Sequence, residues 1–507
     1  MRPVHDVVSV REAERALMER VPDGELMSRA SLGLADLCWA LIEEADIEDP
    51  RVCLLVGSGN NGGDALFAGA ELARRGARLD AVVFSDTPHD AGFTALRLAG
   101  GRHIPAKHTM AASERLVDAD LVIDGIVGIG GSGALRPVAA ELLKSAYAGG
   151  AIMIAADIPS GVEADTGRVA DPEACVNADL TVTFGCYKPG LLLAPGRDHC
   201  GAVALVDIGL DATLPPATVH VLDEEDIADC VPEPGPEDYK YSRGVVGIAA
   251  GSAAYRGAAL MCTGAARHGN VGMVHFLDRG DGIAQVVVDH LWDVVAGSAA
   301  PASLPRVTAW AVGPGLGTDP GALDALRSVL AAPVPVLLDA DALHLVAEHD
   351  LGGELRRRLS DGHPTVLTPH QGEFAALGYS LAPGDDRLAA ARRAARDLGC
   401  VMVLKGPGTI VASPAGAAYL DDRAGAELGT AGSGDVLSGL IAALLAGAAA
   451  RSSVDSEAAA IIAAAGVALH GMAGSIAAEG GRPVTAPDII DAIPDAIASV
   501  RRPGSSA

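Results

Sequence analysis

The stretch LLVGSGNNGGDALFAGAELARRG, residues 54–76, decides the fold of the first half of the chain. An apolar run enters a G-x-G-x-x-G loop at residues 57–62, and a helical sequence follows until Gly76, a residue typical of helix ends. Strand, glycine loop and helix in this order form the turn that carries a nucleotide phosphate in doubly wound α/β folds. Alone, the pattern favours a Rossmann dehydrogenase, with Asp86 placed to meet a ribose hydroxyl.

Polar side chains in the same loop point to different chemistry. Asn60 and Asn61 place two carboxamides at its centre, and Asp64 places a carboxylate where a pyrophosphate would be repelled. Amide and carboxylate oxygens together suit a hard cation or a polyhydroxy ligand. The structural alternative, in which these residues only support the turn and cap the helix, stays open at this point.

Length, composition and net charge limit the class of protein to which the chain can belong. With 507 residues, of which 49% are hydrophobic, two or three domains with large cores are expected. A net charge of −27 argues against a nucleic-acid partner, and any phosphate must be held by local backbone N–H groups, helix N-termini and a few lysines. The eight cysteines are scattered without a C-x-x-C pair, so we expect reduced thiols and neither a zinc site nor disulfides.

No membrane attachment is expected. The N-terminus is charged from Asp6 onward and does not read as a signal peptide, so we predict a cytoplasmic protein. Residues 458–478 are long enough to span a bilayer, but they are mostly Ala and Gly and include His470 and Ser475. We interpret this segment as a buried helix or helix pair.

Short apolar runs bounded by Gly, Asp or Pro recur in both halves of the chain. Continuous runs of this length are typical of strands buried on both faces of a parallel sheet. A Pro-rich, acidic stretch at 212–244 separates the halves, and we predict an α/β fold with two tandem domains, 1–218 and 219–507. The expected strands are 51–57, 79–85, 120–128, 151–159, 180–185 and 202–209, then 244–251, 271–277, 308–315, 334–341, 365–370 and 400–406.

Polar segments follow several of the expected strands in the first half. They are DGIVGIGGSGA (124–134), DIPSG (157–161) and FGCYKPG (184–190). Ligands of open α/β sheets bind beyond the carboxyl ends of the strands, where all these segments lie together with GSGNNGGD. We therefore expect the four segments to form one site.

These motifs resemble, in order and spacing over residues 5–215, the YjeF N-terminal domain, the NAD(P)H-hydrate epimerase family; ELMSRA (25–30) belongs to the same pattern. The resemblance implies a Rossmann-like fold and catalytic roles for Asp157 and Lys188, a carboxylate and an amine across the reacting ring. It implies a potassium ion held by Asn61, Asp124 and Ser160. The implied substrate-binding residues are Asn60, Asn61, Gly62, Gly63, Asp64, Gly128, Ile129, Gly130, Gly131, Ser132, Gly133, Ala134 and Asp157.

The first half departs from the family pattern at two positions. Ala65 stands where the family loop commonly continues as NNGGDG, and Gly125 stands where Asp-Ala commonly ends the strand. Both exchanges replace one small residue by another, so we expect them to alter fine loop geometry and to leave the site intact.

A second glycine loop, GTAGSGDVLSGLIAALLAG at residues 429–447, runs directly into an apolar helix. Free N–H groups at such a helix start make an anion hole. Asp435 lies at its mouth, where a carboxylate is costly beside a phosphate; we interpret it as a base or a hydroxyl ligand, with a helix cap as the structural alternative. Lys405 of LKGPGT and His370 of TPHQGE follow strands and share the expected edge of the sheet.

Residues 225–500 resemble the ribokinase-like superfamily, and more closely the YjeF C-terminal domain, the ADP-dependent NAD(P)H-hydrate dehydratase. The resemblance rests on the segment 240–274, GPGLG (313–317), LDADAL (338–343), TPHQGE, LKGPGT and GTAGSGDVLSG. It implies substrate binding by Ala258, Gly315 or Gly317, His370 and Asp435, and ADP or AMP binding by Lys405, Gly406, Pro407, Gly408, Thr409 and Gly434. Tyr239, where His is common, and Gly425-Ala426, where Gly-Asn is common, depart from the family pattern at the nucleotide edge.

The two implied reactions complement each other. The first domain would epimerise R- and S-NAD(P)HX at C6. In the second, Asp435 would activate the C6 hydroxyl of the S epimer for phosphorylation by ADP, with help from Lys405 and the anion hole, and elimination would give NAD(P)H, AMP and phosphate. We expect potassium at the first site and magnesium at the second, the small molecules NADHX, NADPHX and ADP as partners, and a homo-oligomer that binds neither nucleic acid nor a membrane.

Two other interpretations remain open from the sequence. A small-molecule kinase of the vitamin or sugar type, fused to a Rossmann-like nucleotide-binding module, would give a phosphorylated product and use ATP. A non-catalytic nucleotide-binding protein, whose N-terminal half mediates protein interactions, would bind without turnover.

Overall fold

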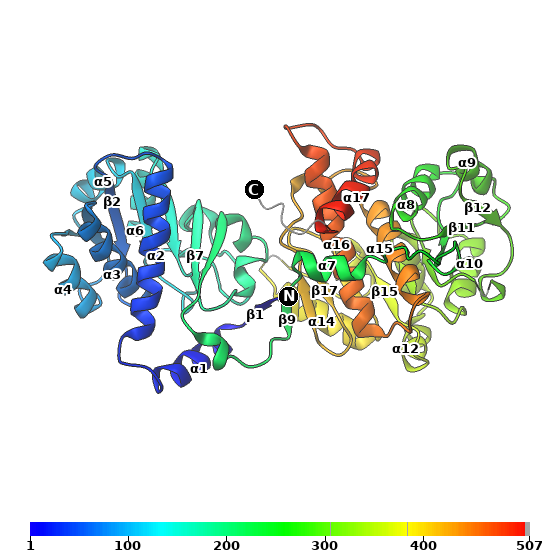
Figure 1. Cartoon of the computed structure of the whole chain (residues 1–507), viewed down its shortest axis with the longest axis horizontal. Helices are drawn as coiled ribbons and strands as arrows, with labels where there is room; N and C mark the ends of the chain where they lie inside the picture. The colour runs from blue at the N-terminus through cyan, green and yellow to red at the C-terminus, as the bar shows by residue number, and fades with distance from the viewer. Residues whose placement is uncertain (305, 383, 502–507) are drawn as a thin grey trace. The chain divides into compact units, whose positions relative to one another are not determined.

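The computed structural model describes residues 1–304, 306–382 and 384–501, and the chain divides into two compact units (Figure 1). One unit comprises Pro3–Ala217, and the other comprises Met1–Arg2 together with the chain from Thr218 onward. Each unit is an α/β structure built on a largely parallel sheet, which confirms the predicted fold class. All the strands expected from the apolar runs are present.

The first unit contains a seven-stranded parallel sheet in the order β4-β3-β2-β5-β6-β7-β8. The order reverses at β2, so the loops after β2 and β5 diverge and leave room for a ligand between them. The strands are β2 (Arg51–Val56), β3 (Arg78–Val83), β4 (Arg102–Pro105), β5 (Leu121–Gly125), β6 (Ile152–Ala156), β7 (Leu180–Phe184) and β8 (Ala202–Val206). The helices are α1 (Val7–Met18), α2 (Glu25–Glu44), α3 (Asn60–Arg75), α4 (Asp90–Leu98), α5 (Thr109–Val117) and α6 (Pro137–Gly149).

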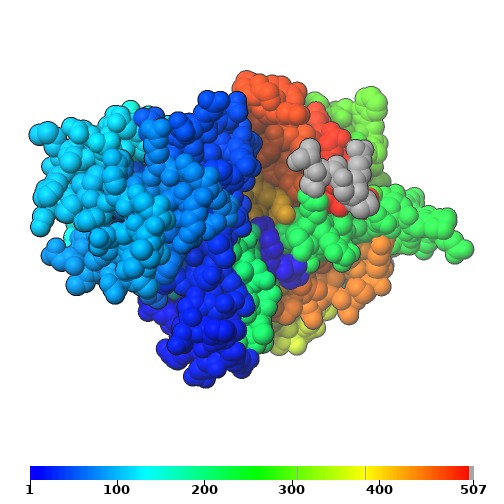
Figure 2. Space-filling view, turned by 60° about the vertical axis from the view of Figure 1, so that its left-hand side comes forward, coloured from blue at the N-terminus to red at the C-terminus, as the bar shows by residue number. Residues whose placement is uncertain are grey.

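Both faces of this sheet are buried, as the unbroken apolar runs predict. Leu54 and Val56 of β2 join a core with α1 to α4, whereas Cys53 and Leu55 point to the opposite face and join a core with α5 and α6. The alternation of side chains along one strand thus supplies both cores of a three-layer α/β/α unit. The N-terminal helices, in blue and light blue, form much of the visible face of the unit in Figure 2.

The second unit contains an 11-stranded sheet in the order β1-β9-β18-β17-β16-β15-β14-β13-β10-β11-β12. Strands β10 to β16 pair in parallel, and β17 reverses direction as a hairpin on β16. The strands are β1 (Arg2–Val4), β9 (Val219–Val221), β10 (Val245–Ala249), β11 (Met273–Leu277), β12 (Val295–Gly297), β13 (Ala309–Val312), β14 (Val336–Leu338), β15 (Thr365–Leu367), β16 (Val401–Leu404), β17 (Ile410–Ala412) and β18 (Ala418–Leu420).

Helices cover this second sheet on both faces. Helices α8, α15, α16 and α17 share one core with the strands, and α10, α12 and α14 contact the strands as well. The helices are α7 (Glu224–Cys230), α8 (Arg256–His268), α9 (Ile283–His290), α10 (Pro320–Leu330), α11 (Asp341–Glu348), α12 (Gly352–Ser360), α13 (Gln371–Ala376), α14 (Arg387–Leu398), α15 (Ser433–Ala449), α16 (Ser456–Ala478) and α17 (Ala486–Arg501).

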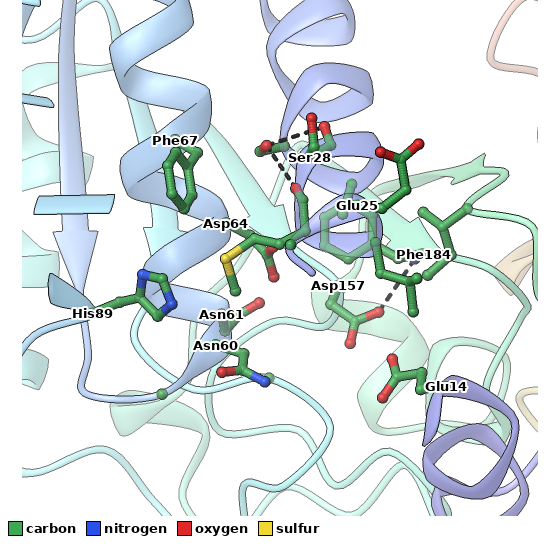
Figure 3. Close-up of a pocket in the computed structure, with 18 of the residues that line it drawn as sticks. Glu14, Glu25, Ser28, Asn60, Asn61, Asp64, Phe67, His89, Asp157 and Phe184 are labelled. Carbon is green, nitrogen blue, oxygen red and sulfur yellow. Dashed lines mark hydrogen bonds between the residues drawn. The ribbon is translucent and has the colours of Figure 1, made fainter. Parts of the chain in front are cut away.

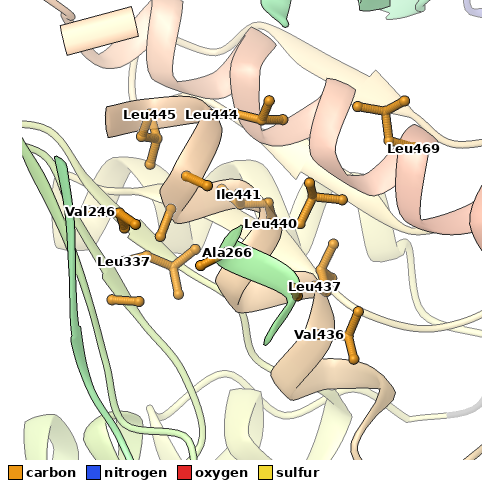
Figure 4. Close-up of a cluster of buried hydrophobic side chains, with 14 of the residues drawn as sticks. Val246, Ala266, Leu337, Val436, Leu437, Leu440, Ile441, Leu444, Leu445 and Leu469 are labelled. Atoms are coloured by element: carbon orange, nitrogen blue, oxygen red, sulfur yellow. The ribbon is translucent and has the colours of Figure 1, made fainter. Parts of the chain in front are cut away.

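Helix α15 is the centre of the second core. It is buried from Val436 to Gly447, and its Leu440 and Ile441 pack among residues of the sheet and of α16 (Figure 4). Within the described part of the chain, α16 is the one helix long and apolar enough to cross a membrane, yet 78% of its apolar window is buried inside the protein. The segment at 458–478 is therefore a core helix, as predicted.

Candidate active sites

A cavity of about 890 Å³ opens at the carboxyl ends of β2, β5 and β6 in the first unit (Figure 3). It reaches along α3 from Asn60 to Arg74, and the start of α2 and one face of α1 close it from other sides. Of the residues expected at the epimerase substrate, Asn60, Asn61, Asp64, Gly128, Ile129, Gly130 and Asp157 line it. The expected residues Gly62, Gly63, Gly131, Ser132, Gly133, Ala134 and Lys188 do not belong to its lining.

The first glycine loop gives this cavity the free start of a helix. α3 begins at Asn60, and its cap residue Gly59 offers no side chain to the first N–H groups, which lack partners inside the helix. A Cβ on Gly57 would lie 1.9 Å from the Ile126 carbonyl oxygen, so this glycine lets the loops after β2 and β5 meet. A Cβ on Gly59 would meet nothing within 4 Å, which leaves the backbone open to a ligand.

Asp157 follows β6 in a left-handed conformation, with φ of 67°, which is uncommon for a residue with a side chain. Its Oδ1 accepts from Lys188 Nζ at 2.6 Å, from Thr183 Oγ1 at 3.2 Å and from Phe184 N at 3.3 Å. Lys188 is 1% exposed and also donates to Thr183 Oγ1 and Phe184 O. The expected arrangement, amine and carboxylate on opposite sides of a ring, is therefore not found: the amine lies behind the carboxylate.

Several carboxyl groups besides that of Asp157 line the cavity, and Glu14 and Asp64 are two of them. Glu14 lines it from α1 and lies with its carboxyl group toward Asp157, and Asp64 lines it from α3 (Figure 3). Burial, reinforced by the charge of Asp157, raises the pKa of Glu14 and raises that of Asp64 well above its usual range. From the sequence, site residues are expected beyond the carboxyl ends of strands. This expectation could not identify Glu14, because Glu14 lies on a helix that precedes the first strand of the sheet. It equally missed Phe67 and His89, which line the far part of the cavity.

The residues expected to hold potassium lie together. Asp124 is fully buried and accepts from both the N–H and the hydroxyl of Ser160 at 2.8 Å, and burial raises its pKa to about 6. Asn61 lies against the adjoining loop, since Cβ atoms on Gly125 or Gly128 would come within 3.2 Å of it. Its buried Nδ2 has no hydrogen-bond partner. Amide, carboxylate and hydroxyl oxygens are ligands that suit a hard cation.

Lys405 lies among the polar side chains at the expected site of the second unit. Its Nζ donates to Asp339 Oδ1 at 2.8 Å and lies 3.8 Å from Glu373 Oε2. Asp339 is 1% exposed, and its second oxygen accepts from Ser438 Oγ of α15 at 2.7 Å. Burial opposes the charge of Lys405, but the carboxylates of Asp339 and Glu373 outweigh it and raise the pKa of the ammonium group. Neither Asp339, Glu373 nor Ser438 was among the residues expected at the site.

Asp435 lies in the first turn of α15, whose cap residue Gly432 is left-handed and provides no side-chain hydrogen bond. A Cβ on the neighbouring Gly434 would lie 3.3 Å from Lys405 Nζ, so the lysine reaches the start of this helix. Burial and the charge of Asp339 raise the pKa of Asp435 to about 6, although Lys405 opposes the shift. A base with this pKa, an ammonium group and free N–H groups of a helix thus meet at one edge of the sheet.

The other expected dehydratase residues lie around this edge. His370 caps α13: its Nδ1 accepts from Gly372 N at 2.9 Å and Glu373 N at 3.2 Å, while 61% of its side chain is exposed. A Cβ on Gly315 would lie 2.7 Å from Ala258 Cβ, so these two expected residues are in contact. Gly317 instead donates its N–H to Asp341 Oδ2 at 2.8 Å.

The expected nucleotide loop connects β16 with β17. Gly406 and Gly408 both have positive φ, and Arg387 donates to the Pro407 carbonyl at 2.6 Å, which fixes the turn. Thr409 is buried, with its hydroxyl on Gly406 O. Among the described residues, no group of three or more His, Cys, Asp or Glu side chains is arranged to hold a metal ion.

Comparison with known proteins agrees with this division. Residues 23–190 match the family model of the YjeF-related protein N-terminus, and residues 246–495 match that of NAD(P)H-hydrate dehydratase. A solved structure of an ADP/ATP-dependent NAD(P)H-hydrate dehydratase from Bacillus subtilis, co-crystallised with ATP and Mg²⁺, has 27% identity and a TM-score of 0.46, covering 56% of this chain and 99% of that one.

Relatives that span both halves carry one description. The Mycobacterium leprae protein is 45% identical over 450 residues, which cover 88% of this chain and 89% of that protein. The Moorella thermoacetica protein is 32% identical over an alignment of 522 positions, which covers 96% of this chain and 96% of that protein. Each is described as a bifunctional NAD(P)H-hydrate repair enzyme, Nnr. The chain therefore belongs to the family of bifunctional NAD(P)H-hydrate repair enzymes.

Proposed function

We propose that this chain repairs hydrated nicotinamide cofactors with two separate sites, an epimerase in residues 1–218 and an ADP-dependent dehydratase in residues 219–507. The observation that carries the proposal is the occurrence of two strand-end sites, each with a free helix N-terminus beside a lysine that is paired with a buried aspartate. An epimerase is useful beside a dehydratase that accepts one epimer, because spontaneous hydration makes both.

In the epimerase site, the start of α3 would bind the pyrophosphate of the hydrate through free N–H groups. The hydrated ring would then lie toward Asp157, which acts as a proton acceptor at the ring. Lys188 would contribute to catalysis indirectly, in place of the predicted direct role at the ring. It would orient Asp157 and balance its charge from the side away from the cavity. Asn61, Asp124 and Ser160 would hold potassium, which supplies a fixed positive charge near the substrate phosphates.

In the dehydratase site, Asp435 would take the proton of the C6 hydroxyl, and the freed oxygen would attack the terminal phosphoryl group of ADP. Lys405 and the N–H groups of Gly434 and its neighbours stabilise the charge that develops on that group. The bond to the α-phosphate breaks and AMP leaves. Loss of phosphate from C6 and of a proton from C5 then restores the dihydropyridine ring.

The remaining expected residues take positions around these reacting groups. We propose that Ala258, Gly315, Gly317 and His370 contact the hydrate and that Lys405 to Thr409 contact the adenine nucleotide. Magnesium would be held mainly by the nucleotide phosphates, the usual manner for this ion. A cytoplasmic homo-oligomer that binds only these small molecules completes the proposal.

The decisive experiment supplies a mixture of both NADHX epimers with ADP and follows the absorbance of regenerated NADH. Complete conversion is expected. Conversion that stops at the S fraction, apart from slow spontaneous epimerisation, would mean an inactive first site. Absence of NADH with either ADP or ATP, or accumulation of a phosphorylated product, would overturn the proposal in favour of binding alone or of a small-molecule kinase.

A further inference from the structure

Epimerisation by loss and return of a hydroxyl group needs two proton-transfer groups. One group must give a proton to the oxygen that departs from one face of the ring, and another must accept a proton from the water that arrives at the other face. Asp157 can fill one of these roles. Lys188 does not line the cavity, and its ammonium group already donates to Asp157, Thr183 and Phe184, so it cannot fill the other.

Glu14 has the position that the second group requires. It lies on α1, an element separate from the loop that carries Asp157. Both residues line the cavity, and in Figure 3 the carboxyl group of Glu14 is directed toward that of Asp157. We propose that Glu14 is a catalytic residue of the epimerase and transfers protons on the ring face opposite Asp157. The inference rests on the proposed epimerase function and adds a residue to it.

The surroundings of the two carboxyl groups differ. Asp157 receives three hydrogen bonds, one of them from an ammonium group. Burial and the charge of Asp157 raise the pKa of Glu14, against the opposing influence of Lys188 and Arg11. Other charged groups lining this cavity are Asp23, Glu25, Asp64, Glu71 and Arg74. A carboxyl group with a raised pKa keeps its proton more readily and can therefore act as a general acid.

The proton transfers balance over one turnover. Glu14 gives its proton to the C6 hydroxyl, the C6–O bond breaks with its electron pair on the departing water, and the ring nitrogen lone pair forms a C=N bond. Water adds to the opposite face of C6, the C=N electrons return to nitrogen, and Asp157 takes the released proton. Transfer of that proton from Asp157 to Glu14 restores the starting state, and the reverse epimerisation exchanges their roles.

Glu14→Gln in the full-length chain tests the proposal, with Glu12→Gln on the exposed side of the same helix as its matched control. With the purified R epimer and ADP, the rate of NADH formation measures epimerisation, provided that dehydration is faster than epimerisation. With the purified S epimer and ADP, the rate measures the second site alone. We expect Glu14→Gln to lower the rate from the R epimer by about 10²–10⁴-fold. Conversion of the S epimer, and both reactions of Glu12→Gln, should remain as in the unsubstituted chain.

Further variants separate proton transfer from a structural effect on α1. Glu14→Ala should recover activity on the R epimer when formate is added, and Glu14→Asp should retain more activity than Glu14→Gln. The decline of epimerase activity at high pH should disappear in Glu14→Gln. Activity of Glu14→Gln within threefold of the unsubstituted chain, or lack of formate rescue with an unchanged pH profile, overturns the proposal. If the unsubstituted chain fails to convert the R epimer, the epimerase function itself is wrong.

Discussion

Each unit pairs a lysine with a buried aspartate, but the two lysines differ in how many of their N–H donors remain free. Lys188 is 1% exposed and donates to three protein acceptors. Lys405 is 18% exposed, donates to Asp339 and reaches the free start of α15. A lysine whose donors are all used fixes a carboxylate, whereas a lysine with donors to spare beside a helix N-terminus can bind a phosphate. On our proposal, the same residue pair serves proton transfer in one unit and phosphoryl transfer in the other.

The largest expected effect tests the independence of the two chemistries. Asp435→Asn should lower the dehydration of the S epimer by about 10²–10⁴-fold, because the base at the phosphoryl acceptor is lost. Epimerisation, measured as the approach of purified R epimer to a mixed R/S ratio by chromatography without ADP, should be unchanged. A variant that still dehydrates at the original rate would refute the role of Asp435 as the base.

The next effect concerns the lysine that lies behind its aspartate. Lys188→Met leaves the buried Asp157 without its partner and should lower the free energy of unfolding of the first unit by about 3–5 kcal/mol. Replacing both partners, as Lys188→Met with Asp157→Asn, should recover much of this stability in denaturant titrations, since neither charge is then buried alone and Asn tolerates the left-handed conformation of residue 157. The double variant should still lack epimerase activity. Equal stability of Lys188→Met and the unsubstituted chain would contradict a positioning role.

The two departures from the family pattern should compensate each other. A Cβ on Gly125 would lie 2.5 Å from the Cβ of Ala65, so the small residues have exchanged places between helix α3 and strand β5. Gly125→Ala should cost about 1–3 kcal/mol through overpacking. Adding Ala65→Gly should recover part of that cost, because the added Cβ would still lie 2.9 Å from the backbone oxygen of Asn61. A double-mutant cycle by thermal unfolding measures the coupling. Strict additivity of the two changes would show that the positions are independent.

The smallest expected effect is a contrast in pH dependence. A base must be ionised to act, so the dehydratase rate should fall about tenfold per pH unit below the Asp435 pKa of about 6. The epimerase needs Glu14 protonated and should instead lose activity as the pH rises. The raised pKa of Asp435 also means that the second unit loses stability as the pH rises from about 4 to 6, since its native state binds more protons there. Parallel pH–rate profiles of the R and S epimers check the contrast.

The sequence predicts the parts of the sites that depend on the parallel sheet. Runs of apolar residues identify the strands, and the residue after each run must lie at one edge of its sheet, so Asp157 of the first unit and Lys405 of the second are each found at the expected edge. This pattern predicts at which edge of the sheet a residue lies, but it does not predict which way the side chain points. Lys188 is the example, because it shares the edge but turns behind Asp157.

Residues that reach a site from elsewhere escape this reasoning. Glu14 comes from a helix ahead of the first strand of its sheet, and its place in the cavity follows from how α1 packs against the rest of the unit. Asp339 lies at an expected strand end, but its bond to Ser438 depends on the distance between that strand end and α15. Such contacts are set by packing between elements far apart in the sequence. The short strands β1 and β9 at one edge of the larger sheet escaped prediction for the same reason.

Helix α15 carries both residues of the proposed active site and residues of the hydrophobic core. Its first turn carries Asp435 and the free N–H groups of the helix start, and the rest of it fills the core of the second unit. Substitutions at core positions such as Leu440 should therefore displace the proposed base as well as alter packing. In directed evolution of this protein, we expect dehydratase activity to respond to substitutions deep in the core of its unit as strongly as to substitutions beside the nucleotide.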